Sequence, residues 1–199
     1  MGKATTKLLK VVRTKGLVRA SELAGLGIPR VALTRAVEGG VLERVGRGLY
    51  GLPGRRKSAH VTLAEVARRV PKGVICLLSA LRFHNLTTQA PFEVWLAIPN
   101  KSATPRLDRP LLRLVRFSGK ALTEGVEEHL VDGVPIRVTS VAKTVADCFK
   151  YRNKIGLDVA LEALREAWGA RRMTSDEIWQ CAKVDRVANV MRPYLEILA

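Results

Sequence analysis

The chain has 199 residues, of which 47% are hydrophobic and 26% are charged, and its net charge is +16. This length can form one good core or two small ones, and the composition is ordinary for a soluble globular protein. The longest apolar run, residues 74–80, is far shorter than the roughly 18–20 residues of a membrane span, and no secretory signal follows the basic N-terminus. We therefore expect a cytoplasmic protein with no membrane contact.

Positive charge is concentrated in the first part of the chain. Residues 1–58 carry thirteen Lys and Arg against three Asp and Glu, whereas the other 141 residues carry 21 against 15. Neutralising phosphates with such a surplus releases condensed counterions, which favours binding to a polyanion. An anionic membrane is the weaker candidate, because turns interrupt the basic residues and no single amphipathic helix carries them.

Three short helices are expected in the first forty residues. The first covers residues 5–14 and the second covers residues 20–24, with a short extended piece at residues 17–19 between them. The third helix opens after Pro29, where the missing N–H of proline costs little, and two glycines stop it after residue 38.

The third expected helix has the pattern of a helix that enters the major groove of DNA. Its apolar residues fall at the i, i+3, i+4 spacing of a core-facing stripe. They are Leu33, Ala36 and Val37. Arg30, Thr34 and Arg35 then point outward, where arginine can bond a guanine edge and threonine can reach a base or a phosphate. Many surface helices carry two arginines, so the segment that follows is needed to support this interpretation.

That segment is a hairpin framed by glycines. Residues 41–45 and 49–52 are apolar-rich strands on either side of residues 46–48. Arg44 lies on the first strand and Arg47 at the tip, where a wing can straddle the DNA backbone or enter the minor groove. Three helices and a basic hairpin predict a winged helix-turn-helix; the alternative is a small basic interaction module. The predicted DNA contacts in this region are Arg19, Ser21, Arg30, Thr34, Arg35, Arg44 and Arg47.

Residues 41–53, which read Val-Leu-Glu-Arg-Val-Gly-Arg-Gly-Leu-Tyr-Gly-Leu-Pro, resemble the wing of the AbiEi-like antitoxins. The resemblance extends back through the helix that contains Ser21-Glu22-Leu23. These antitoxins are the regulatory halves of type IV toxin–antitoxin operons in bacteria, which are linked to abortive infection of phage-attacked cells. The resemblance implies a transcriptional repressor that binds an inverted-repeat operator with two copies per site.

A polar, basic linker divides the sequence. We predict a winged helix-turn-helix domain over residues 1–54, a linker over residues 55–60 and a larger mixed α/β domain over residues 61–199, so the fold class is α+β. The basic residues of the linker are Arg55, Arg56 and Lys57. They either add non-specific phosphate contacts to the predicted DNA-binding site or belong to a solvated linker.

The second domain has the pattern of strands flanked by helices. Strands are expected at residues 92–98 and 112–117, and a hairpin with an Asp-Gly turn at residues 128–138. Residues 73–84 are expected to form a buried helix because of the length of the apolar segment. From Ser140 to the end the apolar spacing is helical.

Three stretches of the second domain, residues 79–86, 94–99 and 139–147, resemble the usual segments of the second domain of the same antitoxins. In that family this domain is needed to counter the partner toxin, a nucleotidyltransferase-like protein encoded next door. No residue can be assigned that task from the sequence.

The sequence has no clear catalytic or metal-binding pattern. His60, His84 and His129 are isolated, and the three cysteines are too far apart for a disulfide framework or a ligand set, so we expect buried, reduced thiols. A metal-dependent nuclease needs clustered carboxylates and a nearby lysine. Asp147 follows Lys143 at i+4, which favours a structural ion pair. We therefore expect no enzyme, no catalytic residue, no metal and no cofactor.

Two functions are compatible with these patterns. The first, implied by the resemblance, is an antitoxin that represses its own operon and counters its toxin, as a monomer or weak dimer in solution. The second is a stand-alone winged-helix regulator whose second domain senses a ligand or dimerises. A neighbouring nucleotidyltransferase gene would favour the first function, and an apolar pocket that holds a small molecule would favour the second.

Overall fold

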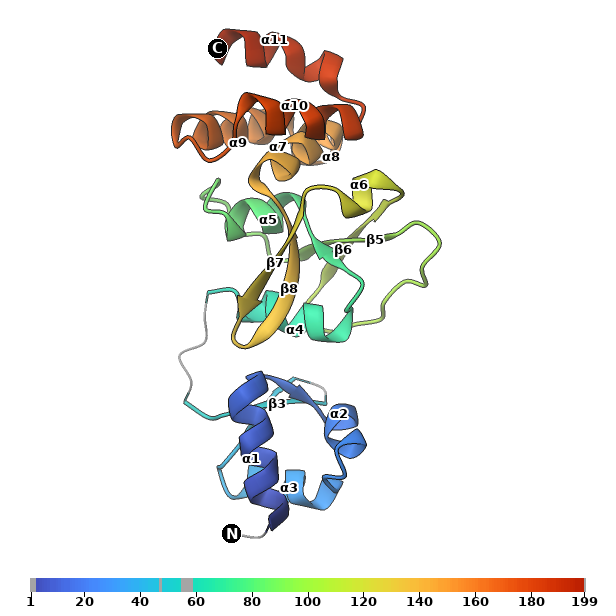
Figure 1. The fold of residues 1–199 in the computed structure, drawn as a ribbon, viewed down its shortest axis with the longest axis vertical. Helices are drawn as coiled ribbons and strands as arrows, with labels where there is room; N and C mark the ends of the chain where they lie inside the picture. Colours follow the sequence, from blue (N-terminus) through green and yellow to red (C-terminus); the bar gives the residue numbers. More distant parts are fainter. Residues whose placement is uncertain (1–2, 47, 55–58, 199) are drawn as a thin grey trace. The chain divides into compact units, whose positions relative to one another are not determined.

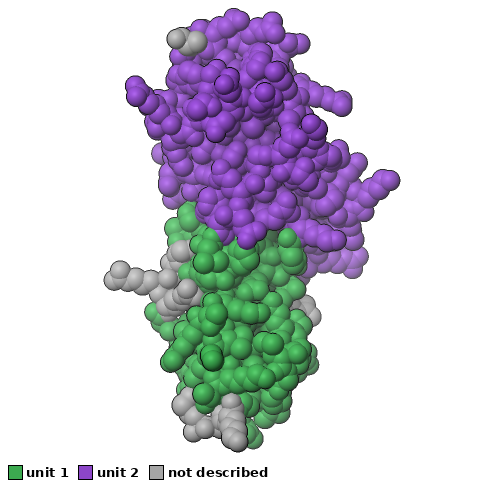
Figure 2. All heavy atoms as spheres, in the orientation of Figure 1, with its two compact units in different colours: residues 1–71, 130–136 green, residues 72–129, 137–199 purple. Residues whose placement is uncertain are grey.

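The computed structural model describes residues 3–46, 48–54 and 59–198. Over these residues the protein combines helices with a three-stranded and a five-stranded sheet (Figure 1), which confirms the α+β class. The chain divides into two compact units, coloured separately in Figure 2. The first unit consists of residues 1–71 and 130–136, and the second consists of residues 72–129 and 137–199.

The first unit begins with three helices and a small antiparallel sheet. The helices are α1 (Lys3–Lys15), α2 (Ala20–Gly25) and α3 (Arg30–Glu38), and the strands are β1 (Val18–Arg19), β2 (Glu43–Gly46) and β3 (Leu49–Gly51). The strand order is β1-β3-β2, so the hairpin formed by β2 and β3 pairs with the short strand that precedes α2. Tyr50 lies in the middle strand, opposite Val18 on one side and Arg44 on the other.

The three helices surround a common apolar core. Leu8 and Val12 on α1 are fully buried, and Leu9 and Val11 beside them are half-buried, which is the expected result of i, i+4 spacing. The buried residues of this core are Leu8, Val12, Val18, Leu23, Ile28, Ala32, Leu33, Ala36 and Leu42. Burial of these side chains determines which face of each helix remains available to solvent.

Helix α4 (Val61–Arg69) belongs to the first unit, although the sequence prediction assigned it to the second domain. The last turn of α4 is bound to the first unit, because Arg68 Nη1 forms an ion pair with Glu22 Oε1 on α2 at 2.9 Å. The Arg19 guanidinium also donates to the carbonyl of Arg69 at 3.5 Å. A linker at residues 55–60 stays a prediction, since residues 55–58 lie outside the described part of the chain.

The second unit is built on a five-stranded sheet. The end of one hairpin of this sheet, Leu130–Ile136, is grouped with the first unit. The strands of the sheet are β4 (Val74–Ile75), β5 (Val94–Pro99), β6 (Leu112–Phe117), β7 (Val126–Val131) and β8 (Val134–Thr139), in the order β6-β5-β4-β8-β7. β5 and β6 are parallel, whereas β4 is antiparallel to β5 and parallel to β8. The predicted strands and the Asp-Gly hairpin are confirmed.

The prediction of one helix over residues 73–84 is wrong in its first part. Val74 and Ile75 form β4, and helix α5 (Leu77–Phe83) begins only after Cys76. Ile75 pairs with Leu96 on one side and with Val138 on the other. Pairing with two neighbouring strands outweighs a helical preference that is weak for β-branched residues, and periodicity alone could not detect it.

The second unit also contains helices after the strand β6. They are α6 (Lys120–Thr123), α7 (Val141–Lys150), α8 (Arg152–Ile155), α9 (Leu157–Gly169), α10 (Ser175–Val184) and α11 (Ala188–Leu198). Helices α7–α11 gather at one end of the sheet in Figure 1, and α7, buried from residue 141 to residue 149, packs against α5, α9 and α10. Cys76 and Cys148 are buried as expected, whereas Cys181 is only half-buried; all three are free thiols.

Candidate nucleic-acid interface

Helix α3 has one face in the core and one face exposed. Its buried residues are Ala32, Leu33 and Ala36. Arg30, Thr34 and Arg35 are exposed, and Val37 is half-buried. The predicted division of this helix into a core-facing and an outward face is therefore confirmed, and the two arginines and the threonine share the outward side.

The outward face of α3 is less polar than its sequence suggested. Thr34 Oγ1 donates to the carbonyl of Arg30 at 3.3 Å, so its hydroxyl hydrogen is used within the helix. Val31, which is 58% exposed, lies on the same side, one turn before Thr34 and Arg35. Val31 was not among the predicted contacts, because only polar side chains were considered on the outward face.

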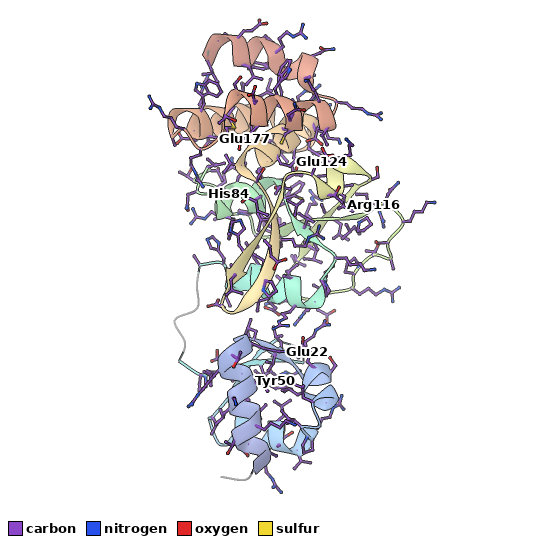
Figure 3. The ribbon with its side chains drawn as sticks, viewed as in Figure 1. Glu22, Tyr50, His84, Arg116, Glu124 and Glu177 are labelled. Atoms are coloured by element: carbon purple, nitrogen blue, oxygen red, sulfur yellow. The ribbon has the colours of Figure 1, made fainter. Side chains whose placement is uncertain are left out.

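The start of α2 holds the next two predicted contacts. Ser21 is exposed in the first turn of the helix, whereas Arg19 is half-buried. The backbone N–H of Arg19 donates to Glu22 Oε2 at 3.0 Å, and its guanidinium bonds to the carbonyl of Arg69. Glu22, labelled in Figure 3, also holds Arg68. Arg19 thus joins α2 to α4, and any DNA contact that it makes must compete with these internal bonds.

The hairpin carries Arg44 on its first strand. Arg44 is exposed, and its Nε donates to the carbonyl of Gly46 at 3.3 Å. The N–H of Ala20 donates to the carbonyl of Gly48 at 3.0 Å, so the end of the hairpin lies against the start of α2. Gly48 has φ +69°, in the left-handed region that favours glycine. Arg47, the predicted tip residue, lies outside the described residues.

The predicted linker contacts also lie outside the described residues. They are Arg55, Arg56 and Lys57. Helix α1 instead provides a basic residue that was not predicted, because Lys7 is exposed and its Nζ donates to the carbonyl of Leu26 at 2.8 Å. Leu26 lies in the turn between α2 and α3, so the charge of Lys7 is held beside that turn. The signal was present in the sequence as lysines that fall outside the apolar stripe of α1.

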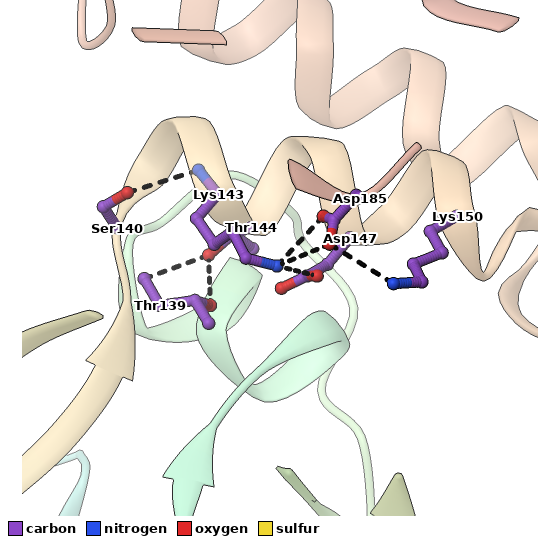
Figure 4. Close-up of polar contacts among 7 residues, drawn as sticks. All are labelled: Thr139, Ser140, Lys143, Thr144, Asp147, Lys150 and Asp185. Carbon is purple, nitrogen blue, oxygen red and sulfur yellow. Dashed lines mark hydrogen bonds and ion pairs between the residues drawn. The ribbon is translucent and has the colours of Figure 1, made fainter. Parts of the chain in front are cut away.

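The second unit contains a buried ion cluster that sequence reasoning found only in part (Figure 4). Lys143 and Asp147 form the ion pair that their spacing predicts. Asp185, which follows α10, completes the cluster with Oδ2 at 2.9 Å from Lys143 Nζ and Oδ1 at 3.4 Å from Lys150 Nζ. Asp185 could not be predicted, because 42 residues separate it from Lys143 and no local spacing relates them.

Two carboxylates and a lysine are also residues of metal-dependent nucleases, but this cluster is arranged differently. The side chains of Lys143, Asp147 and Asp185 are 0% exposed, and the ammonium of Lys143 bonds to both carboxylates. The cluster therefore ties α7 to the end of α10. Within the described ranges, no three His, Cys, Asp or Glu side chains are grouped to hold a metal ion.

Burial determines the ionisation of this cluster. It is the main cause that raises the pKa of Asp147 well above its ordinary value of 3.8, although the ammonium of Lys143 acts in the opposite direction. Burial lowers the pKa of Lys143, but the carboxylates of Asp147 and Asp185 more than offset this and leave its pKa above 10.5. Oδ2 of Asp147 is buried and has no hydrogen-bond partner in the described structure. Within this cluster, the ionised carboxylate of Asp147 therefore lowers the stability of the folded state relative to its protonated form.

We expect Asp147→Asn to change the pH dependence of stability. Because the pKa of Asp147 is higher in the folded state, its protonated form stabilises the fold below about pH 4, and this contribution is lost as pH rises through the folded pKa. The free energy of unfolding of the variant minus that of the wild type should therefore increase from pH 4 to pH 8. Urea unfolding of both proteins at a series of pH values measures this difference in free energy. The contributions of groups that titrate in the same way in both proteins cancel from it. A constant or falling difference would contradict the prediction.

His84 and His129 lie close together in the structure, which their separation in the sequence did not indicate. The ring centroids of His84 and His129 are 6.2 Å apart, and both rings contact Phe83. Burial lowers the pKa of His84, whose Nε2 lies 2.7 Å from the carbonyl oxygen of Thr139. His129 pairs with Glu127 at 3.0 Å. These contacts form a small aromatic and polar cluster around Phe83.

A cavity of about 460 Å³ lies among α7, α10 and the start of β7. Its apolar lining includes Val141, Ala142 and Val184, and its carboxylates are Glu124, Glu127, Asp176 and Glu177. Glu124 and Glu177 are labelled in Figure 3. The volume is within the usual range of small-ligand sites.

Comparison with known proteins gives one family match. Residues 7–53 match the family described as transcriptional regulator, AbiEi antitoxin. The matched segment contains most of α1 together with α2, α3 and the hairpin, which carry the exposed residues Lys7, Arg30, Arg35 and Arg44. The match ends at Pro53, so the resemblance noted for the second domain stays a prediction. No curated protein matches the sequence. No helix in the described ranges has both the length and the apolar character needed to cross a membrane.

Proposed function

We propose that this chain is a DNA-binding antitoxin whose first 54 residues form a winged helix-turn-helix. In this proposal α2 and α3 are the helix-turn-helix, and β2 and β3 form the wing. The observation that carries the proposal is the outward face of α3, where Arg30, Thr34 and Arg35 are exposed within a segment that matches transcriptional regulators. Arginine on an exposed helix is suited to the guanine edge in the major groove, and basic residues on a wing are suited to phosphates.

The proposed target is the promoter of the protein's own operon, in the bacterial cytoplasm. Two copies, monomeric or weakly dimeric in solution, bind an inverted repeat whose half-sites are about one helical turn apart or a multiple of it. Arg44, Arg47 and the basic linker provide phosphate contacts, which position the protein but carry little sequence information. The surplus of positive charge in residues 1–58 supports this arrangement.

A binding assay with the full chain tests this proposal. The protein should bind a duplex from upstream of its own gene about 10³-fold or more tightly than a scrambled duplex of the same composition, measured at physiological salt. Footprinting should show two protected half-sites. Equal affinity for the two duplexes would mean that the protein binds DNA through charge alone, and the proposed repressor function would be wrong.

The second half of the proposal concerns the toxin. We propose that the second unit counters a nucleotidyltransferase-like toxin of a type IV system that acts in abortive infection and phage defence, with no catalytic or cofactor role for this chain. Expression of the neighbouring gene should stop growth, and co-expression of the full chain should restore it. If the neighbouring gene does not impair growth, the antitoxin assignment is wrong.

The cavity in the second unit favours one alternative, a winged-helix regulator that senses a ligand. A lining that combines apolar side chains with a few polar groups is typical of sites that bind small molecules. A compound that changes operator affinity, together with the absence of a neighbouring toxin gene, would support this function over the antitoxin.

A further inference from the structure

We infer that Val31 reads the 5-methyl group of a thymine in the operator, an inference that rests on the proposed DNA-binding function. Val31 is 58% exposed in the first turn of α3, and its neighbours one turn later are Thr34 and Arg35. The N-terminal residues of a recognition helix are those that contact base edges. Val31 therefore lies where a base contact is made if α3 enters the groove.

The position of Val31 within the outward face matters more than its exposure, because single exposed apolar residues are common. With about 100° between successive residues, Arg30 and Arg35 bound an arc of about 140° on the helix, and Val31 lies inside that arc. The exposed residues of this arc are Arg30, Val31, Thr34, Arg35 and Glu38. A residue between two proposed contacts must approach the same groove.

The chemistry of Val31 limits what it can recognise. Its side chain has no donor or acceptor, and the thymine methyl is the apolar group that base pairs present in the major groove. The Thr34 hydroxyl already donates to the carbonyl of Arg30, which leaves the Thr34 methyl as a second apolar group one turn away. The part of this face formed by Val31 and Thr34 is thus suited to a methyl group, and the flanking Arg30 and Arg35 are suited to guanines or phosphates. Glu38, the acidic residue of the arc, lies one turn farther along the helix.

Deoxyuridine substitution tests the inference, because it removes only the methyl group of a thymine. In the preferred duplex, each thymine is replaced in turn and the dissociation constant of the full chain is measured. We expect one position per half-site at which wild-type binding weakens about fourfold, the effect of one buried methyl group. Val31→Ala should bind the unmodified duplex about fourfold more weakly and should be insensitive at that position, whereas Val31→Ile should stay sensitive.

A matched control is Ile197→Ala, which truncates another exposed apolar side chain, in the second unit, and should bind like the wild type. Val31→Ala should fold normally, because the side chain is exposed and alanine has the higher helix propensity; circular dichroism checks this. A preferred duplex that is insensitive to deoxyuridine at every thymine, or a Val31→Ala protein with unchanged sensitivity, overturns the inference and leaves the proposed function intact. If no duplex is preferred, the proposed function fails and the inference fails with it.

Discussion

Replacing Arg30 and Arg35 together by alanine should weaken binding to the preferred duplex by at least about 30-fold. An arginine that bonds a base contributes about 1–3 kcal/mol, and two such losses at the low end amount to about 2 kcal/mol. Both residues are on the outward face of α3, away from the core residues Leu33 and Ala36. The loss should therefore arise from the interface and not from unfolding.

The matched control is the double variant Arg106→Ala, Arg165→Ala, which removes the same charge from exposed positions in the second unit. We expect its affinity to change little. Salt titration then separates two roles of Arg30 and Arg35. Loss of base contacts relaxes specificity, whereas loss of two phosphate contacts lowers affinity for all sequences and reduces the salt slope by about two. If the double variant of α3 binds as tightly as the wild type, α3 is not the helix that enters the groove.

Lys143→Met should destabilise the second unit by about 3–5 kcal/mol, the cost of breaking a buried ion pair by removing one partner. Methionine keeps most of the side-chain volume, so the loss reports on charge and not on a cavity. Without the ammonium, Asp147 and Asp185 face each other in a site where all three side chains are fully buried. Either one of the two aspartates must take up a proton, or both carboxylates must stay charged in an apolar environment. Both outcomes cost free energy in the folded state.

Urea unfolding followed by tryptophan fluorescence measures this loss. Trp95, Trp168 and Trp179 all lie in the second unit, so the signal reports on that unit. Lys183→Met is the matched control, since Lys183 is exposed in the last turn of α10. An unfolding midpoint of Lys143→Met equal to that of the control would show that the ion cluster does not hold α7 and α10 together.

Local patterns predicted the first unit well. The apolar spacing of α3 predicted its buried residues, because a helix of 3.6 residues per turn has one face in the core wherever it packs. Glycines around residues 46–48 predicted the hairpin, since positive φ at Gly48 is a local requirement of the turn. In the second unit, the reciprocal cap of Thr174 and Glu177 at the start of α10 is likewise a local feature, since it needs only two residues three positions apart.

Properties that depend on distant residues could not be predicted in this way. Val74 and Ile75 form a strand because β5 and β8 lie on either side of them. Asp185 joins Lys143 across 42 residues. The end of α4 groups with the first unit because Arg68 reaches Glu22 on α2.

By itself, the sequence determined the types of most elements, the two faces of α3 and the concentration of positive charge near the amino end, because each depends on residues within a turn or two of one another or on composition. Only the tertiary structure decided that Val31 stays exposed when the helices pack, that Arg19 is held by internal bonds and that a lysine is buried with two aspartates. Burial and long-range pairing produce these features, and both depend on which segments meet after the chain has folded.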